Sequence, residues 1–170
     1  MNLFAIEDCE YIKKIYSEHD EVNPHQHHDF GTVVIRFRKE NSAKFVVIRD
    51  KEPCDYVFER VKEYIPNLKQ ITNLKIMKYY VGDALAKHQD FNRYGVDPIY
   101  KTILIQLSNP NDYDGGDLIV KDVIQSREQG SFCVINPTDE HEVTPVTRGT
   151  RFSLVLFLRD TDCIIDKKYI

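Results

Sequence analysis

His88 and Asp90 are separated by one residue and could bind a metal ion together. In an extended strand, residues two apart project from the same face, so the imidazole and the carboxylate can converge on one ion. Such a pair is weak evidence alone, because it arises by chance on many surfaces. Outside a histidine-rich segment near the N-terminus, His141 is the remaining histidine and supplies a third ligand if two strands face each other. Two histidines and one carboxylate form the facial triad of non-haem iron(II), which leaves three adjacent coordination positions open.

Arg151 and Ser153 form a second candidate site, ten and twelve residues beyond His141. The β period places the guanidinium and the hydroxyl on one face, where both could bind one carboxylate. Stacked sheets lie about 10 Å apart, which suits a five-carbon diacid held by a metal on one wall and a cation on the other. The spacing therefore fits 2-oxoglutarate. The alternative interpretation is an edge-strand pair that faces solvent.

The elements that must position these residues begin with two helices. Apolar residues three or four apart predict an amphipathic helix over residues 6–17, and a second helical stripe follows Pro53 and ends near Pro66-Asn67. Between the helices, β-rich runs over residues 32–38 and 44–49 predict a hairpin.

The rest of the chain predicts short strands separated by turns. These strands are expected over residues 74–80, 86–90, 101–107, 117–120, 131–135, 142–146 and 151–158. Short strands separated by turns favour a β-sandwich or jelly roll over βαβ units. We expect a single domain over residues 1–170, in which residues 1–70 pack on a β core of residues 71–160.

Composition restricts the class of protein. The 170 residues carry a formal net charge of -4 and a pI near 5.9, which gives no strong sign of nucleic-acid binding. The cysteines form no C-x-x-C pair, and no long apolar run predicts a membrane span. We therefore expect reduced thiols and a cytoplasmic protein; the sequence does not predict its oligomeric state. The four cysteines are Cys9, Cys54, Cys133 and Cys163.

Residues 74–159 resemble the catalytic core of the prolyl 4-hydroxylase-like family of 2-oxoglutarate and iron(II)-dependent oxygenases. Three motifs carry the resemblance: Tyr79-x-x-Gly82 with His88-x-Asp90; Asp114-Gly115-Gly116-Asp117-Leu118; and His141-x-Val143-x-Pro145-Val146-x-x-Gly149-x-Arg151-x-Ser153-Leu154. The last motif is the most specific.

The resemblance implies a mainly β fold with flanking helices, a double-stranded β-helix (jelly roll, cupin-like). It implies a metal triad of His88, Asp90 and His141, and binding of the co-substrate by Arg151. By the same likeness Tyr79, nine residues before His88, helps to hold the distal carboxylate. The implied cofactors are Fe(2+), 2-oxoglutarate and O2, and ascorbate remains open as a further one.

The implied activity is hydroxylation of an unactivated C–H bond with succinate and CO2 as co-products. The expected substrate is a protein or peptide side chain, with proline as the leading candidate. Leu85 stands where many relatives have an aromatic residue, and the chain has no tryptophan, so these departures bear on substrate contacts. The loops over residues 19–29 and 91–98 are candidate lids, and Gly115-Gly116 is expected to form a tight turn with positive φ.

Other interpretations remain open. A nucleic-acid demethylase would, by family pattern, carry a second arginine where Phe157 stands, and a small-molecule oxygenase is a further alternative. A catalytically silent jelly-roll binding module could use the fold for recognition only. Structural zinc is disfavoured because no cysteine lies beside the triad in the sequence, and His25, His27 and His28 could bind a second metal or form a solvated loop.

Overall fold

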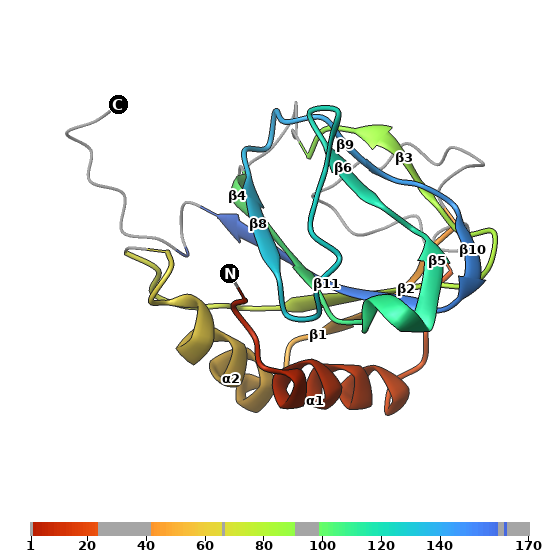
Figure 1. Cartoon of the computed structure of the whole chain (residues 1–170). Coiled ribbons are helices and arrows are strands. Elements are labelled where there is room, and N and C mark those ends of the chain that lie inside the picture. Colours follow the sequence, from red (N-terminus) through yellow and green to blue (C-terminus); the bar gives the residue numbers. More distant parts are fainter. Residues whose placement is uncertain (1, 24–41, 66, 91–98, 160–161, 163–170) are drawn as a thin grey trace.

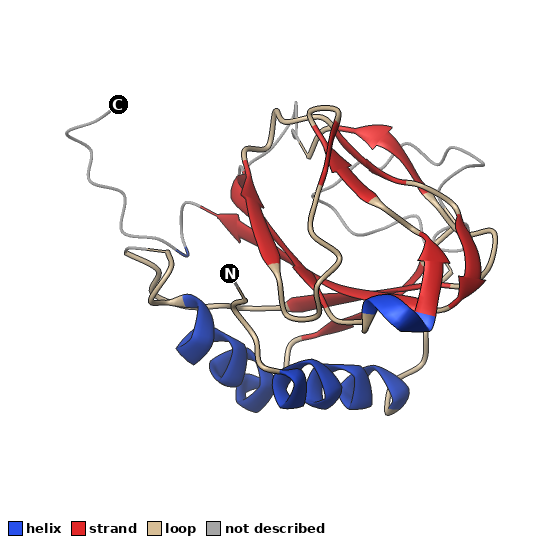
Figure 2. Ribbon diagram, viewed as in Figure 1, coloured by secondary structure: helices blue, strands red, loops and turns tan. Residues whose placement is uncertain are grey.

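The computed structural model describes residues 2–23, 42–65, 67–90, 99–159 and 162. Two helices lie on one face of a five-stranded antiparallel sheet, and a four-stranded sheet faces it from the other side (Figure 1, Figure 2). The chain therefore forms a mainly β fold with flanking helices, as the sequence predicts.

The helices pack through their predicted apolar stripes. α1 (Ile6–Ser17) has the predicted bounds, and it buries Cys9, Ile12, Ile15 and Tyr16. α2 (Lys51–Val61) contains Pro53 in its first turn and ends before the expected Pro66-Asn67, because residues 62–64 form a turn.

The five-stranded sheet has the order β1-β2-β11-β4-β8. Its strands are β1 (Lys44–Ile48), β2 (Leu74–Tyr79), β11 (Arg151–Arg159), β4 (Ile99–Gln106) and β8 (Phe132–Ile135). Both faces of this sheet are covered, so both sets of alternating residues along the central strand β11 are buried or half-buried.

Alternation along the central strands separates structural residues from site residues. Leu154, Leu156 and Leu158 of β11 join the core beneath the helices. The intervening Arg151, Ser153 and Val155 instead line a pocket between the two sheets. The same parity in β2 directs Tyr79 into this pocket. The strand period therefore positions the polar groups that the sequence singles out.

The four-stranded sheet has the order β3-β9-β6-β7, and a separate pair joins β10 to β5. These strands are β3 (Leu85–His88), β9 (His141–Val143), β6 (Leu118–Val120), β7 (Val123–Ile124), β10 (Val146–Gly149) and β5 (Tyr113–Gly115). A short 3-10 helix, η1 (Pro110–Asp112), precedes β5.

Two strand predictions are wrong in their limits, and a further strand forms where the sequence predicts a turn. The strand expected over residues 142–146 is split at Thr144-Pro145, since proline lacks the N–H that a ladder requires. β5 lies inside the turn expected around Gly115, and β3 ends at His88, two residues before Asp90. The β1 segment pairs with β2, whereas the expected strand over residues 32–38 lies outside the described residues.

Candidate metal centre and co-substrate pocket

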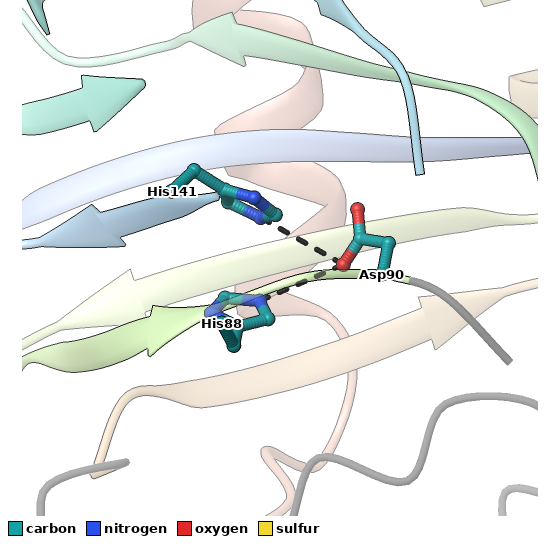
Figure 3. A group of neighbouring side chains, drawn as sticks. All are labelled: His88, Asp90 and His141. Atoms are coloured by element: carbon teal, nitrogen blue, oxygen red, sulfur yellow. Dashed lines mark ion pairs between the residues drawn. The ribbon is translucent and has the colours of Figure 1, made fainter. Parts of the chain in front are cut away.

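His88, Asp90 and His141 converge on one point in the structure (Figure 3). Their potential ligand atoms all lie within 4.8 Å of one another. Asp90 Oδ1 is 3.5 Å from His88 Nε2 and 3.7 Å from His141 Nε2. His88 and His141 are opposite each other in the β3–β9 ladder, which brings their rings to 4.2 Å between centroids. Ligand bonds of roughly 2.0–2.2 Å can reach three atoms this close from a single ion.

Both imidazoles are oriented by the backbone. His88 Nδ1 lies 2.8 Å from the Ala86 carbonyl oxygen, and His141 Nδ1 lies 3.0 Å from that of Asp139. A carbonyl only accepts, so each Nδ1 carries the proton and each Nε2 presents a lone pair toward Asp90. Burial lowers the pKa of His141, with Asp90 opposing the shift, so this ring is neutral near pH 7.

Asp90 lies beyond the end of β3, and its orientation depends on the opposite sheet. Its side chain is 2% exposed, and Thr102 Oγ1 of β4 donates to Asp90 Oδ2 at 2.7 Å. Burial raises the pKa of Asp90, but the interactions of its carboxylate with His88, His141 and Thr102 outweigh the effect of burial, so the pKa of Asp90 is lowered. The carboxylate is therefore ionised at neutral pH, with Oδ1 directed at the histidines.

Arg151 lies in the same pocket with unsatisfied hydrogen-bond donors. The residue is 2% exposed, and its Nε and Nη1 atoms have no hydrogen-bond partner. An unpaired buried donor costs about 1–3 kcal/mol, and more when it is charged. A dianionic ligand with one carboxylate at Arg151 would remove this cost. The residues present therefore fit a diacid such as 2-oxoglutarate.

Tyr79 and Ser153 flank the guanidinium. Tyr79 is opposite Arg151 in the β2–β11 ladder, and the Arg151 Cζ atom is 4.9 Å from the centre of its ring. Burial raises the pKa of Tyr79, whereas Arg151 and Ser153 oppose the shift, so its hydroxyl stays protonated at neutral pH. Ser153 is 5% exposed and lines the same pocket. The structure thus brings all six predicted site residues to one cavity.

The glycine pair before β6 shapes the wall beside Arg151. Gly115 and Gly116 have φ values of 67° and 62°, as the sequence predicts for a tight turn. A Cβ on Gly116 would lie 3.0 Å from Arg151 Cδ and 2.9 Å from Val146 Cγ2. Glycine is therefore required here for the guanidinium to keep its place.

Comparisons with known proteins agree with this geometry. The 2OG-Fe(II) oxygenase superfamily matches residues 74–159, about half of the chain. A PKHD-type hydroxylase of Xanthomonas campestris pv. campestris is 29% identical over 102 residues, which cover 56% of this chain and 44% of that relative. The chain thus spans less than half the length of this curated relative.

Solved structures share the fold at low sequence identity. A Pseudomonas putida prolyl-4-hydroxylase is similar with a TM-score of 0.65 at 15% identity, over 93% of this chain and 89% of that one. A prolyl hydroxylase from Trichoplax adhaerens, in complex with a peptide fragment of the hypoxia inducible factor oxygen degradation domain, has a TM-score of 0.63 at 18% identity, over 95% and 82%. These similarities confirm the predicted jelly roll.

The chain belongs to the 2OG-Fe(II) oxygenase superfamily. The family description names both cofactors, Fe(II) and 2-oxoglutarate, which confirms these two predicted cofactors. Helices long and apolar enough to cross a membrane are absent from the part of the chain that the structure describes.

Thr102 and Lys75 are polar residues near the triad that are not among the predicted site residues. Thr102 of β4 donates a hydrogen bond to Asp90, and Lys75 of β2 lines the pocket. A buried threonine at an inward position is the signal that could have identified Thr102. The histidines at 25, 27 and 28 lie outside the described residues, as do residues 24–29 of the candidate lid over residues 19–29 and the whole of the candidate lid over residues 91–98.

Proposed function

We propose that His88, Asp90 and His141 bind Fe(II), that Arg151 binds the distal carboxylate of 2-oxoglutarate with Tyr79 and Ser153 beside it, and that the protein hydroxylates an unactivated C–H bond. Succinate and CO2 are the co-products. One observation carries the proposal: the buried Arg151 guanidinium, whose Nε and Nη1 atoms have no hydrogen-bond partner, shares a pocket with the triad. An unpaired buried cation is costly unless a ligand supplies the missing anion.

Each residue has a defined part in this function. The Nε2 atoms of His88 and His141 and Oδ1 of Asp90 bind one face of the ion, because their other polar atoms are already hydrogen-bonded. Arg151 orients the co-substrate so that its keto acid end is directed at the metal. Bound Fe(II) and 2-oxoglutarate supply the oxidising chemistry. Met77, Val143 and Val155 give the pocket apolar walls that exclude water from the reacting centre.

We propose that the substrate is a protein or peptide side chain, with proline as the leading candidate. The Trichoplax prolyl hydroxylase in complex with a peptide fragment supports this choice, since it shares the fold of this chain. We also propose a single domain and a cytoplasmic location. The second proposal is supported by the free thiols of Cys9, Cys54 and Cys133, which suit a reducing compartment.

The test combines cofactor binding with turnover. Protein loaded anaerobically with Fe(II) and 2-oxoglutarate should develop a visible metal-to-ligand absorption band, and air with a proline-containing peptide should then yield succinate. A protein that binds neither cofactor would refute the proposal. Formation of the band without succinate for any peptide, amino acid or nucleic-acid probe would instead favour the silent binding module.

Two variants separate the proposed roles. His88→Ala should abolish iron binding, since it removes one ligand of three. Arg151→Ala should leave iron binding intact and weaken the binding of 2-oxoglutarate. Equal loss of metal in both variants would contradict this division of roles.

A further inference from the structure

A second cation, Lys75 of β2, lines the pocket that holds the triad. Its Nζ atom lies 4.6 Å from the centre of the Phe45 ring and 5.8 Å from that of Phe157. No ion pair or hydrogen bond of this ammonium group is formed with the residues that the structure describes. Burial lowers the pKa of Lys75 to about 8, and the negative charge of Asp90 opposes this shift. Lys75 is thus a half-buried cation that lies near two aromatic rings and lines the pocket.

The strand register places Lys75 at the metal end of the pocket. Thr102, which donates a hydrogen bond to Asp90, is opposite Phe157 of β11. Lys75 is opposite Val155, which lies two residues before Phe157 on the same strand. Arg151 is opposite Tyr79, four residues from Lys75, which corresponds to about 13 Å along the strand. Lys75 is therefore separated from the proposed site of the distal carboxylate and lies beside the centre where oxidation would occur.

Among the residues that the structure describes, the charges of the loaded pocket leave the Lys75 ammonium group without a counter-ion. The two positive charges of Fe(II) are balanced by Asp90 and by the carboxylate at the keto acid end of 2-oxoglutarate, and Arg151 is balanced by the distal carboxylate. Asp90 is the acidic residue that acts on Lys75 among the described residues. Because metal binding neutralises Asp90, the ammonium group is left open to a further anion, and the substrate can provide it.

We propose that Lys75 binds a carboxylate of the substrate close to the carbon that is oxidised, so that the protein selects substrates with an acidic group beside the hydroxylated position. This inference rests on the proposed function and makes its substrate class more specific. Phe45 and Phe157 flank the ammonium group and provide apolar surface for the neighbouring part of the substrate. The carboxylate could belong to an acidic side chain, to a peptide C-terminus or to free proline.

Peptide binding under anaerobic conditions tests the proposal without turnover. Protein loaded with Fe(II) and 2-oxoglutarate would be titrated with labelled proline-containing peptides, and anisotropy would report binding. One peptide carries glutamate beside the proline and an amidated C-terminus, a second carries glutamine, and a third ends in proline with a free carboxylate. Free L-proline, added as a competitor, tests whether the carboxylate of the free amino acid binds at Lys75. We expect a carboxylate probe to bind about tenfold or more tighter than the neutral peptide, the size of a charge-assisted hydrogen bond.

Variants of Lys75 assign this preference to one side chain. Lys75→Met should reduce the preference to about twofold or less, and Lys75→Arg should preserve it, because the guanidinium keeps the charge. Lys78→Met is the matched control: Lys78 stands on the same strand but contacts Tyr16 and Tyr80 outside the pocket, so the preference should remain. The affinity for 2-oxoglutarate should be the same in Lys75→Met and the unmodified protein.

Three outcomes would overturn the inference. They are a preference that survives Lys75→Met, an unmodified protein that binds no carboxylate probe better than the neutral peptide, and a loss of 2-oxoglutarate affinity in Lys75→Met. The visible band and succinate production are recorded in the same preparations. A protein that lacks both fails the proposed function, whereas a protein that shows both without the preference fails the lysine assignment alone.

Discussion

Replacement of Thr102 with valine would remove one hydroxyl while nearly preserving the shape of the side chain. The hydroxyl donates to Asp90 Oδ2 at 2.7 Å, and both side chains are buried. A hydrogen bond to a charged group contributes about 1.5–3 kcal/mol. At about 1.4 kcal/mol per tenfold, this corresponds to a loss of roughly 10- to 150-fold in Fe(II) affinity. Loss of an outer hydrogen bond to a metal ligand typically costs about 10- to 100-fold, which agrees.

Anaerobic competition between the protein and a coloured chelator would measure this affinity. Thr102→Ser is the matched control, because it keeps the donor and removes one methyl group. We expect Thr102→Ser to bind Fe(II) within about threefold of the unmodified protein, well short of the effect of losing the donor. Affinities that are equal in the valine variant and the unmodified protein would refute the role of Thr102. An equal loss in the serine and valine variants would attribute the effect to packing instead.

Three further predictions concern other parts of the molecule. Arg151→Met should weaken 2-oxoglutarate by at least roughly 100-fold and leave Fe(II) binding unchanged, as calorimetry with each ligand would show. Gly116→Ala should also weaken the binding of 2-oxoglutarate, because the added Cβ would contact the Arg151 side chain. Gly82→Ala is the control: Gly82 also has positive φ, but a Cβ there would have nothing within 4 Å, so this variant should alter stability alone. Asp8→Asn should lower the free energy of unfolding at pH 7 by roughly 1–3 kcal/mol, because Asp8 accepts hydrogen bonds from Tyr56 and Arg60. Burial raises the pKa of Asp8, but the hydrogen bonds outweigh the effect of burial and bring the pKa below 3.8. The ionised carboxylate therefore stabilises the fold above about pH 4. The difference in the free energy of unfolding between Asp8→Asn and the unmodified protein should narrow as the pH falls further. Urea unfolding of both proteins at pH 7 and pH 3 would check this.

The sequence predicts much of the site because strand alternation acts over short distances. Arg151 and Ser153 are two residues apart on one strand, so their common face follows from the β period alone. The proximity of His88 and His141 depends on pairing between β3 and β9, which periodicity cannot specify. The resemblance to a known family supplied that long-range information.

Other features depend on contacts that no local pattern encodes. Asp90 is turned toward the histidines by Thr102 from the opposite sheet, although it lies beyond the end of β3. β5 contains Asp114-Gly115, residues that are depleted in strands, and it forms because it pairs with β10. The position of Lys75 beside the triad likewise requires the register of β2 against β11.

Anomalous diffraction at the iron edge, from crystals grown anaerobically with Fe(II) and 2-oxoglutarate, would show whether His88, Asp90 and His141 bind iron together. We predict one strong peak within bonding distance of His88 Nε2, Asp90 Oδ1 and His141 Nε2, with the distal carboxylate of 2-oxoglutarate at the Arg151 guanidinium. A peak at His25, His27 and His28 with none at the triad, or a co-substrate bound away from Arg151, would contradict the proposed roles of the triad and of Arg151.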